Sequence, residues 1–165
     1  MNDSPKINYW RLAGILLFGF YFLTCALHAE DWHFIDNVDL IIHEAGHWIF
    51  IFFGEFIQIL GGSLNQVLIP LIFAIYFILR EDYYSSSVVF LWVGYSIVNV
   101  SVYMGDAIKM QLPLLGGDNV IHDWNYLLNH SHLINYTHML SSLTYSIGVF
   151  MIIGAAVWGV RETRG

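Results

Sequence analysis

The stretch LIIHEAGHWIFIFFGEF, from Leu40 to Phe56, places three ionisable side chains inside an apolar run. His43 and His47 are four residues apart, so on a helix their rings lie one turn apart on the same face. Ionisable groups deep in an apolar segment are costly and usually functional. What surrounds this stretch therefore decides both the fold and the role of the three groups.

The composition of the whole chain predicts an integral membrane protein. Of the 165 residues, 57% are hydrophobic and only 12% are charged, and the charged share is about half of that in soluble domains. A soluble fold of this size could not bury so much apolar surface. The length suits a single membrane-embedded domain, residues 1–165. No Lys/Arg cluster is present, which excludes nucleic acid as a partner and leaves membrane lipids.

Apolar segments separated by short polar breaks predict an all-α, polytopic transmembrane helical bundle in a cell membrane. We expect about five segments, at 12–28, 34–60, 67–79, 87–108 and 139–160, with a polar connection at 109–138. GGSLNQ, Gly61 to Gln66, is expected to separate the second segment from the third. The first segment is expected to be an uncleaved span, the alternative being a signal peptide that ends at Ala29.

Positive charges do not orient a bundle of five spans. An odd number of spans places the two termini on opposite sides of the membrane. The six cations then divide evenly, with one side carrying Lys6, Arg11 and Lys109 and the other Arg80, Arg161 and Arg164.

The opening stretch contains the pattern HExxH, in which two histidines bind Zn²⁺ and the glutamate acts as general base. His43 and His47 are the expected metal ligands, and Glu44 lies close enough to reach a metal-bound water. The alternative is a polar packing cluster with each histidine hydrogen-bonded across helices. Three ionisable groups at metal-site spacing favour zinc.

The chain resembles the site-2 protease class of intramembrane zinc metalloproteases. HEAGH matches the histidine motif of that class, and GGSLNQ loosely matches its Gly-Pro-x-x-Asn break, with Ser63 where proline is usual. The Leu-Asp-Gly-Gly element that supplies the third ligand in the class does not appear intact. The resemblance covers about Asp36 to Asp123 and implies a zinc protease whose third ligand is an aspartate.

The third ligand has several candidates. Asp106 ends an apolar segment and shares a helix face with Asn99 and Tyr103, so it is the expected ligand. The competing candidates lie in LPLLGGDNVIHDW, where two of them are four residues apart and a third is adjacent: Asp118, His122 and Asp123.

Two further acids, Asp36 and Asp39, precede His43 on the same helix face. They are expected either to orient the histidines as hydrogen-bond acceptors or to be solvated residues at the start of the helix.

These residues together predict hydrolysis of peptide bonds in or near the membrane, with a transmembrane protein as substrate. Glu44 is expected to act as general base on a zinc-bound water. Two different functions also fit the sequence. One is that of a non-catalytic membrane protein that binds zinc structurally or retains a degenerate protease core, and the other is that of a membrane zinc hydrolase that acts on lipid amides.

Overall fold

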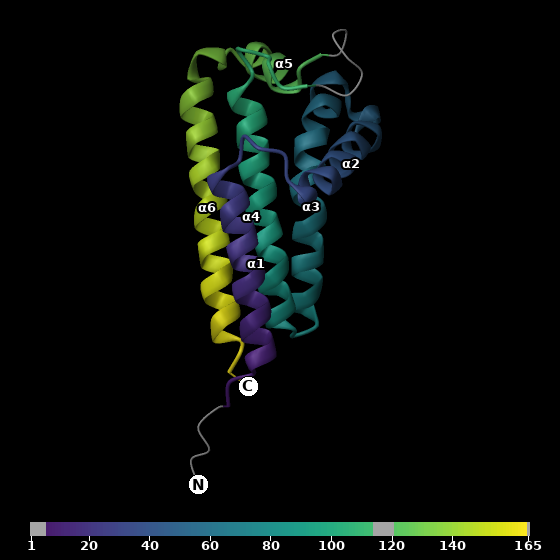
Figure 1. The fold of residues 1–165 in the computed structure, drawn as a ribbon. Coiled ribbons are helices and arrows are strands. Elements are labelled where there is room, and N and C mark those ends of the chain that lie inside the picture. Colours follow the sequence, from purple (N-terminus) through teal and green to yellow (C-terminus); the bar gives the residue numbers. More distant parts are fainter. Residues whose placement is uncertain (1–5, 114–120, 165) are drawn as a thin grey trace.

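The computed structural model describes residues 6–113 and 121–164, which form helices joined by short connections (Figure 1). No strand occurs in these two ranges, so the expected all-α fold is confirmed for them. The elements are α1 (Tyr9–Leu27), α2 (Phe34–Ile49), the 3₁₀ helix η1 (Ile51–Phe53), α3 (Glu55–Leu79), α4 (Tyr83–Gly105), α5 (Asp123–His130), the 3₁₀ helix η3 (Ile134–Tyr136) and α6 (Thr137–Arg161).

Among the described residues, four helical stretches are long and apolar enough to cross a membrane. They are α1, α3, α4 and the stretch Ile134–Arg161, which contains α6. This agrees with a helical membrane protein, but the expected number of about five spans is corrected to four.

The difference arises in the segments expected at 34–60 and 67–79. The boundary between two helices lies near Gly54 and not at the expected break, residues 61–66. Helix α2 has only 16 residues, and the chain turns at Gly54, whose φ of 87° is rarely adopted by other residues. Helix α3 then runs 25 residues without interruption, through GGSLNQ and through Pro70. The expected break at residues 61–66 is therefore helical, and α2 lies beside one end of α3 (Figure 1).

Helix α4 lies at the centre of the bundle and packs against α1, α3 and α6. An apolar core fills the space between α1, α4 and α6, and close packing of this kind holds helices together where lipid surrounds them. Its buried members are Ile15, Phe22, Cys25, Ala26, Leu91, Tyr95, Val98, Ile152 and Ala155.

The first and last described residues lie together at one end of the bundle (Figure 1). The backbone N–H of Asn8 donates to the carbonyl oxygen of Thr163 at 2.8 Å, and Ile7 pairs with Arg164. The expectation of termini on opposite sides is thus wrong, because the described residues contain an even number of candidate spans and the two ends of the chain lie together. Helices α2 and α5 lie at the other end.

Candidate metal centre

The HEAGH motif lies on α2, and small residues bring this helix close to α3. A Cβ atom on Gly46 would collide with the backbone of Gly61, so only glycine allows this approach. The Asn65 side chain of α3 donates to the Ile42 carbonyl oxygen of α2 at 2.7 Å. The glycine inside HEAGH therefore serves the contact between the two helices, and that contact turns His43 and His47 toward α3 and α5.

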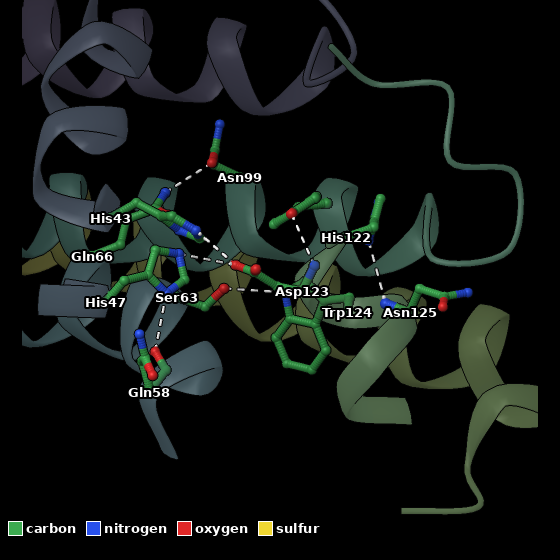
Figure 2. Close-up of polar contacts among 11 residues, drawn as sticks. His43, His47, Gln58, Ser63, Gln66, Asn99, His122, Asp123, Trp124 and Asn125 are labelled. Carbon is green, nitrogen blue, oxygen red and sulfur yellow. Dashed lines mark hydrogen bonds and ion pairs between the residues drawn. The ribbon is translucent and has the colours of Figure 1, made fainter. Parts of the chain in front are cut away.

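Both imidazole rings are held by an acceptor on their Nδ1 atom (Figure 2). Nδ1 of His43 lies 3.2 Å from Oε1 of Gln66, and Nδ1 of His47 lies 3.0 Å from the carbonyl oxygen of Gln58. An oxygen acceptor requires that each Nδ1 carry the hydrogen. This fixes the tautomer and leaves the Nε2 atom of each neutral ring as the free ligand atom.

The two Nε2 atoms converge on one carboxylate oxygen. Oδ2 of Asp123 lies 2.9 Å from Nε2 of His43 and 3.3 Å from Nε2 of His47. Lone pairs on two nitrogens and on an oxygen would repel one another at these distances. A hydrogen on Nε2, or a metal ion bound by all three groups, would remove this repulsion.

Asp123 is the first residue of α5, and two hydrogen bonds set its position. Its backbone N–H donates to the Tyr103 hydroxyl oxygen at 3.1 Å, and the next residue, Trp124, donates from Nε1 to Oγ of Ser63 at 3.1 Å. Burial alone would raise the pKa of the Asp123 carboxyl, but when both Nε2 atoms carry hydrogens, the hydrogen bonds from His43 and His47 outweigh burial and hold this pKa below its usual value. Asp123 is thus a carboxylate that is ready to bind a cation.

These three side chains fit a bound metal ion. Their ligand atoms all lie within 4.8 Å of one another. The backbone of Gly62 lines the space, because a Cβ there would lie 2.5 Å from Nε2 of His43 and 2.7 Å from Nε2 of His47. The absence of a side chain at Gly62 keeps the Nε2 atoms accessible.

Asp106, the expected third ligand, is not part of this group of side chains. Its carboxylate accepts hydrogen bonds from the backbone N–H groups of Gln111 and Leu112 at 3.0 and 2.9 Å, and lies 3.3 Å from Nε2 of His122. These donors satisfy the buried charge that the sequence had led us to assign to zinc. The described geometry therefore replaces Asp106 by Asp123, a competing candidate in the sequence.

His122, a further candidate for the third ligand, has a different role in the structure. It accepts the backbone N–H of Asn125 on Nδ1 at 3.3 Å and so caps the start of α5, while its Nε2 faces Asp106. Both ring nitrogens are engaged, so His122 positions Asp123 and is not in the metal group. The remaining candidate, Asp118, lies outside the described residues.

Asp36 and Asp39 are 3% and 1% exposed, and their carboxylates do not accept hydrogen bonds from His43 or His47. Asp39 accepts from Trp92 Nε1 at 2.7 Å. Asp36 accepts from Asn99 at 3.0 Å. Neither acid is a solvated residue at the start of the helix, and neither accepts directly from His43 or His47, because both carboxylates accept from side chains of α4.

Asp36 nevertheless reaches His43 through two amides. Asn99 donates to Asp36, Gln66 donates to Asn99 Oδ1 at 2.8 Å, and Gln66 Oε1 accepts from His43 at 3.2 Å. All donors point the same way along this chain, which ends on a carboxylate. Such a chain orients the imidazole and increases its basicity.

Glu44 lies next to His43 in the sequence but is not one of the possible metal ligands. It is half-buried and lines a cavity of about 280 Å³ next to His43. Tyr103, Gln66 and Asn99 line the same cavity. Glu44 is thus a carboxylate that is absent from the metal group but lines the same cavity as His43.

Two groups that hold the rings, Gln66 and the carbonyl of Gln58, were not predicted from the sequence. Gln66 carried a usable signal, since an amide side chain in an apolar helix needs a partner. The carbonyl of Gln58 gave none, because every residue has one.

We found no match to this chain among protein-family models, curated proteins or solved structures.

Proposed function

We propose that this chain is an integral membrane zinc metalloprotease that hydrolyses peptide bonds in or near the membrane. The observation that carries the proposal is the convergence of His43 Nε2, His47 Nε2 and Asp123 Oδ2 beside a cavity that Glu44 lines. The resemblance of HEAGH to the histidine motif of site-2 proteases supports it.

The donor set favours zinc over other common metals. Two imidazole nitrogens and one carboxylate oxygen suit Zn²⁺, whereas Mg²⁺ and Ca²⁺ prefer oxygen ligands alone. Three protein ligands are the number found in catalytic zinc sites, which keep one position for water or substrate. When bound, zinc supplies a Lewis acid that polarises a carbonyl and lowers the pKa of a coordinated water.

The residues of the chain divide the remaining work. His43 and His47 present Nε2 because acceptors hold their Nδ1–H groups. The Glu44 carboxylate takes the proton of the attacking water and delivers it to the leaving amine, which balances the hydrolysis. The Tyr103 hydroxyl accepts from the backbone of Asp123, so its own hydrogen is free to donate into the cavity that it lines.

A second candidate function is a purely structural metal centre. The observation in its favour is that Asp123 connects α5 to α2 through the same atoms that would hold the ion. In this case the metal would tie the polar connection to the bundle, and Glu44 would have no chemical role. The two candidates therefore differ at Glu44 alone.

The test compares the wild-type chain with Glu44→Gln and with the His43→Ala/His47→Ala pair. For a protease, Glu44→Gln keeps about one zinc per chain but loses at least about 10²–10⁴-fold in turnover, because an amide cannot accept the proton. The histidine pair loses the zinc. Glu81→Gln is the matched control, since Glu81 is exposed in the turn between α3 and α4, at the end of the bundle away from the site.

Turnover is followed by quantitative labelling of new N-termini in membranes from cells that express each variant. New termini that depend on Glu44 support the protease. Identical termini in the wild-type and Glu44→Gln membranes, with zinc still bound, would identify the structural centre instead. Undiminished zinc in the histidine pair would overturn both.

A further inference from the structure

The cations of the chain gather at one end of the bundle. The first described residues, the turn between α3 and α4, and the last described residues lie together there (Figure 1). The guanidinium of Arg11 lies 5.2 Å from the ring of Tyr84, the second residue of α4, and Arg164 pairs with Ile7. Five of the six Lys and Arg residues are found at this end: Lys6, Arg11, Arg80, Arg161 and Arg164.

The opposite end carries one cation, Lys109, which follows α4. That end also carries α2, α5 and the candidate metal centre (Figure 1). A count of five spans had divided the cations evenly, because it placed Arg80 and the C-terminal arginines on the side away from Lys6. Residues 55–79 form a single helix, so one span fewer precedes Arg80, Arg161 and Arg164. These three arginines therefore lie on the same side as Lys6.

This asymmetry has a physical consequence for insertion. Lys and Arg in short loops and near helix ends are retained on the cytoplasmic side, whereas Asp and Glu contribute little. The α3–α4 turn is short, and each of the five cations lies within a few residues of a helix end. A ratio of five to one is a strong bias in a protein with four spans.

The metal centre lies near the opposite face. Gly62, at which an added Cβ would meet both histidines, is seven residues from the start of α3 at Glu55. With a rise of 1.5 Å per residue, this is about 10 Å along a helix that is about 37 Å long. The centre is therefore embedded in the outer third of the bundle, within reach of one face only.

We infer that the bundle is inserted with Lys6, the α3–α4 turn and Arg164 in the cytoplasm, and that the candidate metal centre is reached from the non-cytoplasmic face. The second half of this inference rests on the proposed function and names its substrate class. The substrates are peptide segments of membrane or exported proteins that lie at, or just inside, the non-cytoplasmic surface.

The orientation is tested by cysteine accessibility, which does not require activity. The only natural cysteine, Cys25, is 2% exposed and is replaced by alanine. Single cysteines are then introduced as Glu81→Cys at the cationic end and as Asn129→Cys in α5, both at exposed positions. Spheroplasts are treated with a membrane-impermeant maleimide before and after permeabilisation, and a Cys25→Ala chain without a new cysteine serves as the blank.

We expect Asn129→Cys to react in sealed spheroplasts and Glu81→Cys only after permeabilisation. The reverse pattern would overturn the inference, and so would equal reactivity of the two positions in sealed spheroplasts or no reaction of either before permeabilisation. Failure of the protease proposal would instead appear as unchanged N-termini in the Glu44→Gln membranes, with the labelling pattern intact. The two failures are thus distinguishable.

Discussion

Replacing Gly62 by alanine should remove the metal while leaving the bundle folded. The Cβ of an alanine would lie 2.5 Å from Nε2 of His43 and 2.7 Å from Nε2 of His47. An ordinary contact begins at 3.4 Å, so the His43 ring must retreat by about 0.9 Å, whereas a metal site tolerates deviations of about 0.2 Å in its ligand distances. Both rings therefore lose the geometry for binding.

The cost to folding is much smaller than the cost to binding. Overpacking of this kind costs about 1–3 kcal/mol, and alanine regains about 1 kcal/mol over glycine in a helix interior. The net change is at most about 2 kcal/mol, which a bundle with an intact α1–α4–α6 core can absorb. The zinc affinity should fall at least about tenfold, because the loss of an outer hydrogen-bond partner alone already costs about 10–100-fold.

The assay is the zinc content of the purified chain by mass spectrometry, together with competition against a chelator and thermal unfolding in detergent. Gly154→Ala is the matched control, because an added Cβ at Gly154 of α6 meets nothing within 4 Å. The control should keep its zinc and gain slightly in stability. A Gly62→Ala chain that binds zinc as tightly as the wild type would refute the placement of the ion between His43 and His47.

Two further predictions concern the groups around the two rings. Asp123→Ala should lose zinc because a ligand is removed. Asp106→Ala should retain zinc with lower affinity, because α5 loses its anchor at His122. Chelator competition measures the zinc affinity of both variants, and equal losses would contradict the assignment of Asp123 as the ligand. Gln66→Leu should weaken zinc binding by about 10–100-fold, since the Nδ1–H of His43 loses its acceptor. An unchanged affinity in Gln66→Leu would show that the amide does not orient the ring.

The sequence was sufficient for the fold class and for the face of α2 that carries His43 and His47. Composition and long apolar runs predicted a helical membrane bundle because lipid admits few other structures. The spacing of His43 and His47 predicted a shared helix face, and the structure turns both rings toward one carboxylate. These features depend on local periodicity, which a single sequence displays directly.

The third member of the group could not be chosen from the sequence. Asp106 ends an apolar segment and Asp123 lies in the polar connection that follows it, and only the course of the chain between them decides which approaches His43. The decisive contacts are long-range ones, such as the hydrogen bond from Trp124 to Ser63 across 61 residues. Periodicity contains no information on such pairings.

The largest error was the prediction of residues 34–60 as one span. The acidic side chains of α2 explain both this error and the position of the candidate metal centre. Asp36, Asp39 and Glu44 all lie in α2, and each carboxylate would cost about 2.5–3.5 kcal/mol at the centre of a membrane helix. A helix with three such groups gains little by crossing lipid. It is more stable as a short element that lies against α3 and α4, where side chains of α4 donate to Asp36 and Asp39.

Tyr95 and Asn99 donate to Asp36, and Trp92 donates to Asp39, so the acids that exclude α2 from lipid also fasten it to α4. Once fastened, α2 cannot rotate without breaking these bonds. His43 lies four residues, about one turn, beyond Asp39 and must then face the same interior. The polar residues that prevent α2 from spanning the membrane thus fix the direction of the imidazole, and the Gln66–Asn99 link to Asp36 extends that control to its Nδ1–H. The position of the candidate metal centre near one end of the bundle therefore follows from a short, polar helix that packs there.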